Sequence, residues 1–410
     1  MNRQQFEHIL RTYVVPMFAG ATVEDGGEAP HVRQQRRLGF QLNGQEIVVR
    51  SSSDADYQLK IRRAQYFQPE DADFVDAFLE KLEEIDAVAE LAVFNDLINP
   101  TIRRTVSEQL SQSAADLIYQ VLVQFENWSE QTYEGRRIAA AVGIDPTNQG
   151  GSGVPLMDVY AKSFGAVLAN GLDSFLTAAQ NGDIIAYEPV PQVPSSASLF
   201  APIRFARLAE WSTGGKIGLG LNRNGEILLF KDKKLIFSKR RGRWLHFTHD
   251  AVIKRVGLHR SIAKEVCTAI YQTCLDVSFA RTGGCVAVAR RTEKAGLLSS
   301  HRVNAADQIG STGLKGRCLG AIVGRPFQEL DRRLRQDIVA MDGATVLDYK
   351  GNLIAAGAIV EVRAGSDGGG RLAASKALAK YGLAIKISSD GEIRGFSSKG
   401  GTILEMFSVG

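Results

Sequence analysis

Apolar residues in the first half of the chain recur mainly at helical spacing. Two stripes of this kind lie between residues 69 and 182, formed by Phe74, Phe78, Leu79 and Leu82, and by Leu117, Ile118, Val121 and Phe125. Such stripes predict amphipathic helices. Asn99-Pro100 fits an N-cap followed by proline at the first helical position, so it predicts that the second helix starts there.

Two other patterns complete this half of the chain. Residues 40–49 alternate between apolar and polar, and Asn43-Gly44 is a hairpin turn signal, so a small α/β start is expected. Residues 157–179 predict a further helix. We interpret its apolar stripe as helix core, with a partner-binding face as the alternative; the stripe consists of Phe164, Val167, Leu168, Leu172 and Phe175. Together these patterns predict a mostly helical N-terminal region.

The second half alternates strands with helices. Four short apolar runs with the turn signal Asn224-Gly225 predict an antiparallel meander, at residues 217–221, 227–230, 235–237 and 244–247. Beyond them, helical patterns alternate with apolar strands, with helices at 261–280, 326–339 and 372–381 and strands at 285–289, 344–347, 353–360 and 383–387. Apolar strands between helices predict an α/β fold with a mixed sheet flanked by helices.

A domain boundary is expected where the composition resists regular structure. The chain has 410 residues, enough for two domains. Residues 188–202 contain four prolines and three serines, which disfavour both helix and sheet. We therefore expect a helical region over residues 1–190 and a second domain over residues 200–410.

Charge differs sharply between the two halves, although the net charge of the whole chain is only +4. Residues 1–200 hold 15 Lys and Arg against 27 Asp and Glu, a net charge of −12, whereas residues 201–410 hold 34 against 18, a net charge of +16. A basic half suits an anionic polyphosphate partner. Attraction between the two halves is the alternative explanation.

Composition excludes several classes of protein. Hydrophobic residues make up 44% and charged residues 23% of the chain, as in ordinary globular proteins, which excludes wholesale disorder. No apolar run reaches the roughly 20 residues of a membrane-spanning helix, and the N-terminus lacks a signal-peptide pattern, so we expect a cytoplasmic protein without a membrane partner. The cysteines lack metal-ligand spacing and are expected to be packed, reduced thiols: Cys267, Cys274, Cys285 and Cys318.

Two segments contain residues that are candidates for binding phosphate. The glycine-rich run 365–371 opens into a helix, so its backbone N–H groups and the side chain of Arg371 can hold a phosphate. A flexible connection is the alternative, since the run does not match the P-loop pattern. Asp342 stands at the entrance of a buried strand, where an aspartate is commonly a turn former.

The order of these segments resembles the diadenylate cyclase (DAC) domain, which joins two ATP molecules into cyclic di-AMP. That family shows Asp-Gly-Ala, a strand ending near Ala-Ala, then Gly-Thr-Arg-His-Arg-Ala-Ala opening a helix, and a strand ending in Ser. The same order runs here through Asp342-Gly343-Ala344, Ala355-Ala356, the glycine-rich run with Ala373-Ala374, and Ser388. The resemblance covers residues 250–395 and implies a DAC-like nucleotide-binding domain.

The resemblance also implies a role for each matching residue. Asp342 would be the catalytic carboxylate and would hold Mg²⁺ or Mn²⁺ if the protein is catalytic. Gly343 and Ala344 would let the nucleotide approach the backbone, and Ser388 would meet phosphate oxygens. The remaining nucleotide-binding residues would be Gly368, Gly369, Gly370 and Arg371.

The Arg-His-Arg motif of the family is eroded in this chain. Its positions fall on Gly370, Arg371 and Leu372, so two of the three polyphosphate-binding side chains are missing. Each lost charged hydrogen bond costs about 1.5 to 3 kcal/mol, which would slow turnover roughly 10²- to 10⁴-fold if both act in the transition state. The pattern is similar to diverged DAC-like sensor domains of prokaryotic conflict systems, the DACNV type. We expect a sensor for ATP or a cyclic dinucleotide; an active cyclase, working as a homo-oligomer, is the alternative.

A basic run in the predicted meander suggests a third hypothesis, a nucleic-acid-binding module. Its cations surround apolar residues, with Trp244 available for stacking, and comprise Lys231, Lys233, Lys234, Lys239, Arg240, Arg241 and Arg243. Solvated lysines that protect a sheet edge are the alternative. His246, His249 and His259 are interpreted as capping or core residues rather than metal ligands.

Overall fold

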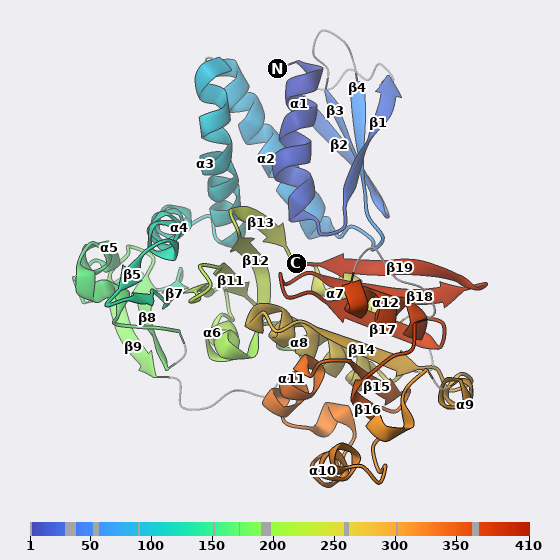
Figure 1. Cartoon of the computed structure of the whole chain (residues 1–410). Coiled ribbons are helices and arrows are strands. Elements are labelled where there is room, and N and C mark those ends of the chain that lie inside the picture. The colour runs from blue at the N-terminus through green and yellow to red at the C-terminus, as the bar shows by residue number, and fades with distance from the viewer. Residues whose placement is uncertain are drawn as a thin grey trace. The chain divides into compact units, whose positions relative to one another are not determined.

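The computed structural model describes residues 2–28, 38–51, 57–88, 91–150, 152–171, 173–189, 198–257, 262–300, 302–362 and 369–410. The chain forms two compact units, Met1–Thr248 and His249–Gly410 (Figure 1). With this division the first unit holds 26 Lys and Arg against 30 Asp and Glu, a net charge of −4, and the second holds 23 against 15, a net charge of +8. The charge contrast is therefore smaller than the sequence halves indicate.

The division between the units lies later than the boundary expected at residues 188–202. Strand β7 (Ala140–Asp145) precedes that stretch and β10 (Ile217–Leu221) follows it, yet the two pair antiparallel, with Ile144 opposite Ile217. The proline-rich stretch therefore connects strands of one sheet. Local composition cannot distinguish such a connection from a linker between domains, because proline and serine are common in both.

The first unit begins with a small lobe in which a helix precedes an antiparallel sheet. Helix α1 (Arg3–Ile9) continues as a π-helix (Leu10–Val14) and a 3₁₀ turn (Val15–Met17). The sheet has the order β1-β4-β3-β2, with β1 (Thr22–Glu28), β2 (Leu38–Asn43), β3 (Glu46–Ser51) and β4 (Tyr57–Arg62). The predicted hairpin is confirmed, since β2 and β3 pair around Gly44, whose φ is +59°.

Three helices follow, α2 (Pro69–Val88), α3 (Leu91–Leu110) and α4 (Ala115–Ser129). Both predicted stripes are buried. The expected helix start at Asn99-Pro100 is wrong, because α3 begins at Leu91 and contains Pro100 in its interior. Proline inside a helix costs about 3 kcal/mol, but burying two large apolar side chains such as Phe94 and Ile98 returns about 1.5 to 3 kcal/mol each.

A seven-stranded sheet completes the first unit, in the order β13-β12-β11-β10-β7-β8-β9. Its other strands are β8 (Ser174–Ala179), β9 (Ile184–Pro189), β11 (Ile227–Lys231), β12 (Lys234–Arg240) and β13 (Arg243–His246). Short elements complete the unit: β5 (Thr132–Tyr133), β6 (Arg136–Arg137), a 3₁₀ turn (Ile203–Phe205) and α6 (Ala206–Trp211). The predicted antiparallel meander from β10 to β13 is confirmed.

The helix expected over residues 157–179 is wrong. Helix α5 (Leu156–Tyr160) and a 3₁₀ turn (Ser163–Ala166) are short, and the segment ends in β8, which is parallel to β7. All six residues of β8 are buried. A strand buried on both faces shows no alternation of apolar and polar residues, so its pattern is easily taken for helix. Phe164, Val167 and Leu168 are exposed and form no helix core, and Leu172 lies outside the described residues.

The second unit contains a six-stranded mixed sheet in the order β16-β15-β14-β17-β18-β19. The strands are β14 (Gly284–Ala289), β15 (Ala344–Asp348), β16 (Leu353–Ala358), β17 (Gly382–Ile387), β18 (Ile393–Lys399) and β19 (Thr402–Val409). Strands β14 and β15 are parallel, and the other neighbours are antiparallel. The main helices are α7 (His249–Val256), α8 (Lys264–Ala280), α9 (Lys294–Ser299), α10 (Leu314–Ile322), α11 (Arg332–Ala340) and α12 (Gly369–Leu378).

Helices cover both faces of this sheet. On one face, Cys285 of β14 lies 3.2 Å from the hydroxyl of Ser375 in α12. On the other face, the hydroxyl of Thr345 in β15 donates to the carbonyl of Ile338 in α11. The predicted α/β class, with a mixed sheet flanked by helices, is confirmed, and helices predominate in the N-terminal region as far as Ser129.

Candidate nucleotide site at one edge of the second sheet

The strand register brings the residues of the DAC-like motifs to one edge of the sheet. Strands β14 and β15 run parallel, with Val286 opposite Thr345, so Gly284 is level with Gly343. Strand β17 runs the opposite way and places Ile387 opposite Gly284. The residues before β14 and β15 and the residue after β17 therefore share an edge, here called the amino edge. It carries Asp342, Thr282-Gly283 and Ser388.

The carboxylate of Asp342 is exposed at the amino edge. Its Oδ1 accepts a hydrogen bond of 3.1 Å from the N–H of Gly343, which fixes the turn into β15. This is the turn-forming role that aspartate often has at a strand entrance. Because the side chain is exposed to solvent, its carboxylate is also accessible to a ligand.

Packing within the sheet accounts for the small residues that follow Asp342. Gly343 has a φ of +102°, and a Cβ there would come within 2.5 Å of the carbonyl carbon of Gly357. Ala344 is fully buried in the core of the unit. The close approach at Gly343 is therefore to the neighbouring strand β16, and nucleotide contact at either residue stays a prediction.

Two glycines begin α12. Gly369 has a φ of +79°, and among the described residues a Cβ added at Gly369 or Gly370 would meet no packed atom within 4 Å. The first N–H groups of a helix have no partner within the helix, so this end can bind an anion. Gly368 lies outside the described residues.

The side chain of Arg371 extends from α12 to the amino edge. Its Nη2 donates to the carbonyl of Thr282 at 3.4 Å, and a Cβ added at Gly283 would come within 2.5 Å of its Nη1. The same position at Gly283 lies 3.2 Å from the carbonyl oxygen of Ile387, the residue before Ser388. Arg371 and Ser388 are therefore neighbours across the start of β14.

Ser388 begins the turn between β17 and β18. Its N–H donates to the carbonyl of Glu392 at 2.8 Å, and its own carbonyl accepts from Gly391 at 3.0 Å. The backbone of Ser388 is thus fixed by the turn, and its side chain is half-buried. Arg281, which ends α8 in a left-handed conformation, donates to the carbonyl of Asp390 in this turn.

Sequence reasoning missed a lysine and an aspartate at this edge. The ammonium of Lys315 in α10 donates to Asp307 at 2.8 Å and to the carbonyl of Gly357, beside the backbone of Asp342. Burial raises the pKa of Asp307, but the hydrogen bonds from Lys315 and from the N–H of Ile359 outweigh it and lower that pKa overall. Neither residue belongs to a motif, and only the fold brings them to the amino edge, so the sequence carried no signal for them.

The amino edge could contribute only a small part of the coordination of a metal ion, and a bound nucleotide would have to supply most of the remaining oxygens. Among the described residues, no group of three or more His, Cys, Asp and Glu side chains could hold a metal ion. Mg²⁺ commonly binds through one or two carboxylates together with phosphates and water. Asp342 could supply one such carboxylate, which fits the expected Mg²⁺ or Mn²⁺ only when a nucleotide is bound.

The proposed stacking role of Trp244 is wrong. Trp244 is 4% exposed and packs in the core of the first unit, with Lys239 above its ring. Arg240 is buried in an ion pair with Glu226, and Lys239 pairs with Glu126 at 2.7 Å. The basic run therefore does not present a continuous cationic face, because several of its charges are used inside the unit.

The histidine interpretation is confirmed for the two described histidines of this group. His246 is buried, with Nδ1 2.9 Å from Asp71, and His249 is buried against the hydroxyl of Tyr271. His259 lies outside the described residues.

Of the four cysteines, three are packed thiols as expected. Cys267, Cys274 and Cys285 are buried, whereas Cys318 is exposed, contrary to expectation, because it lies on the outer face of α10.

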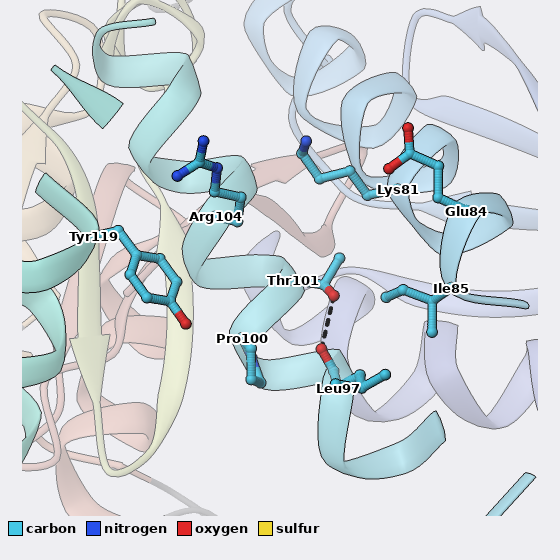
Figure 2. Close-up of a pocket in the computed structure, with 8 residues that line it drawn as sticks. All are labelled: Lys81, Glu84, Ile85, Leu97, Pro100, Thr101, Arg104 and Tyr119. Atoms are coloured by element: carbon cyan, nitrogen blue, oxygen red, sulfur yellow. Dashed lines mark hydrogen bonds between the residues drawn. The ribbon is translucent and has the colours of Figure 1, made fainter. Parts of the chain in front are cut away.

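The first unit contains a cavity of about 340 Å³ between α2, α3 and α4 (Figure 2). Lys81 and Arg104 line it, and Thr101 donates its hydroxyl to the carbonyl of Leu97 beside Pro100. Lys81 already pairs with Glu108 at 2.8 Å, and Arg104 pairs with Glu108 and Asp116. Because these cations have carboxylate partners, the cavity does not rival the amino edge as an anion site.

None of the described helices combines the length and apolarity needed to span a bilayer. Comparisons of this chain with models of protein families and with curated proteins found no match.

Proposed function

We propose that the second unit binds a nucleotide through its phosphates at the amino edge. The supporting observation is that Asp342, Arg371 and Ser388, which are far apart in sequence, lie at the same edge of one sheet. Arg371 supplies a guanidinium for phosphate, and the first turn of α12 supplies backbone N–H groups. Asp342 holds a divalent cation that reaches the protein with the nucleotide.

We further propose that this unit is a diverged DAC domain acting as a sensor rather than as an efficient cyclase. The order of its motifs supports the relationship. Arg371 is the one charged side chain left at the three positions of the Arg-His-Arg motif, and Leu372 packs against the core instead of reaching a ligand. Binding tolerates the loss of two cationic contacts better than turnover does, because turnover also needs them in the transition state.

Isothermal titration of the full chain with ATP and with cyclic di-AMP, in the presence of Mg²⁺, tests this proposal. We expect binding of at least one of them, weakened about tenfold or more by Arg371→Gln, as expected for one lost charged hydrogen bond. Arg333→Gln is the matched control, because Arg333 is an exposed arginine at the start of α11. Absence of binding at millimolar nucleotide, or equal binding by both variants, would refute the site.

Incubation with Mn²⁺ and ATP, followed by mass spectrometry, separates the sensor from the enzyme. The sensor hypothesis predicts no cyclic di-AMP above background. Product that disappears in Asp342→Asn would instead establish a cyclase.

A further inference from the structure

A second cavity lies at the opposite edge of the same sheet. Strands β14 and β15 end there, at Ala289 and Asp348. The cavity measures about 480 Å³, a size typical of small-molecule sites, and lies between α9 and the turn after β15 (α9 and β15 in Figure 1). In open α/β sheets, ligands commonly bind outside the carboxyl ends of parallel strands. This carboxyl edge was not indicated by any sequence motif.

The lining of this cavity is strongly basic. Arg291, Lys294 and Lys350 line it together with one carboxylate, Asp348, so the lining carries a net charge of +2. The side chain of Asp348 is 3% exposed and lies 2.9 Å from the ammonium of Lys294. Asp348 also accepts from the backbone N–H groups of Lys350 and Asn352, at 2.9 and 3.0 Å.

This arrangement fixes the cavity wall and leaves cationic groups for a ligand. The buried carboxylate of Asp348 holds the turn after β15 and anchors Lys294 to it. Within the described part of the chain, Arg291 and Lys350 have no carboxylate partner. Two unpaired cations beside an anchored lysine are suited to an anion with several oxygens, since guanidinium and ammonium groups both bind phosphate.

The cavity also has a less polar wall. Leu298 of α9 is 36% exposed, and Tyr349 lines the cavity with the ammonium of Lys350 5.9 Å from its ring centre. Aromatic and apolar side chains beside a few charged groups are typical of sites for small organic ligands.

We propose that the carboxyl edge binds a small molecule that carries phosphate groups, with Arg291 and Lys350 contacting the phosphate oxygens and Tyr349 contacting the rest of the ligand. This site is separate from the amino edge and does not depend on the function proposed there. Such a ligand could be an inorganic polyphosphate or a nucleotide. Pyrophosphate and ADP distinguish these two classes, because ADP carries an aromatic base and pyrophosphate does not.

Titration of the full chain with pyrophosphate and with ADP at low salt tests the site. We expect that Lys350→Gln and Arg291→Gln each weaken binding about tenfold, which is the effect of losing one charged hydrogen bond. Lys350→Arg keeps the positive charge, so we expect it to retain the affinity. Arg223→Gln, in an exposed turn of the first unit, is the control for loss of one charge. If Tyr349 contacts the ligand, ADP binds more tightly than pyrophosphate, and Tyr349→Ala removes the difference.

Arg371→Gln separates this site from the amino edge. Binding that survives Arg371→Gln and is lost in Lys350→Gln places the ligand at the carboxyl edge. Binding that is unchanged in both Lys350→Gln and Arg291→Gln, or that is lost in Arg371→Gln alone, overturns the proposal. So does an absence of binding by either probe at millimolar concentration.

Discussion

The guanidinium of Arg371 lies so close to Gly283 that a Cβ added there would come within 2.5 Å of its Nη1. The glycine that precedes β14 thus leaves the space in which the guanidinium of Arg371 lies. This relationship between α12 and β14 makes the amino edge sensitive to a residue outside every DAC-like motif.

Gly283→Ala should therefore reduce nucleotide binding by displacing Arg371. It should also destabilise the unit by about 1 to 2 kcal/mol, since the φ of Gly283 is +68°. Gly400→Ala is a suitable control, because Gly400 also has a positive φ, +59°, and its Cβ would meet open space. Titration with ATP and urea unfolding measure the two effects. Equal affinity in the two variants would show that the position of Arg371 does not affect binding.

Removing one partner of the buried ion pair between α8 and α11 should strongly destabilise the second unit. Arg332 donates to both oxygens of Asp276, at 2.7 and 2.8 Å, and the side chain of Asp276 is fully buried. Burial, followed by the charge of Arg332, lowers the pKa of the neighbouring Arg335 to about 10. Asp276→Asn leaves both buried arginines without this counter-charge, so we expect it to lose about 3 to 5 kcal/mol in urea unfolding.

Glu405→Gln is the comparison for that measurement. Glu405 pairs with Arg394 in a partly exposed position, at 27% and 30% exposure, and such pairs contribute at most about 1 kcal/mol. Similar losses for the two variants would contradict the importance of the buried pair.

The stability of the first unit should depend on the ionisation of Asp71. Burial raises the pKa of this carboxyl, but the hydrogen bond with His246 and the charge of Arg63 outweigh burial and hold the pKa below its usual value. A lowered pKa contributes stability that is complete above the unfolded pKa of about 3.9 and is lost as the pH falls through the folded value. We therefore expect Asp71→Asn to lower Tm at pH 7. As the pH falls below about 4, the stability of this variant should decrease less than that of the wild type.

Asp73→Asn provides the control on the same helix, because Asp73 is exposed. Thermal melts of the three proteins between about pH 2 and pH 7 measure the difference. Parallel Tm profiles for wild type and Asp71→Asn would show that this carboxylate does not link folding to pH.

Thiol reactivity should distinguish Cys318 from the other cysteines. Burial raises the pKa of Cys267 and of Cys285 to about 11, and it raises the pKa of Cys274 as well. The thiolate is the reactive form, so these buried thiols should react only after unfolding. Iodoacetamide followed by intact mass should show one label on the native protein and none on native Cys318→Ser. More than one label on the native wild type would contradict the buried packing.

Much of the second unit could be predicted from sequence, because its strands are short apolar runs between helices. The run at 285–289 is β14, and the helices between β14 and β15 are typical of neighbouring strands that run parallel. The grouping of Asp342 with Ser388 was therefore accessible from the order of the elements. Lys315 was not, since it reaches the amino edge only through the path of the loops, and the basic cavity at the carboxyl edge belongs to no recognisable motif.

The errors in the first unit have a different cause. Strand β8 is buried on both faces and lacks the alternation that identifies a strand, and α3 retains Pro100 because its packing outweighs the lost hydrogen bond. Trp244 stands among cations in the sequence, but its ring belongs to the core of the unit. In each case tertiary packing overrides a local pattern, and a local pattern contains no information on packing partners.

Strand β14 has six residues and reaches from one edge of its sheet to the other. At about 3.3 Å per residue, anions bound beyond its two ends would lie roughly 20 Å apart. That separation exceeds two Debye lengths of about 8 Å at physiological salt, so their charges would scarcely repel each other. Both edges could be occupied together, and any influence of one ligand on the other would have to be transmitted mechanically, through the strand and the helices packed on it.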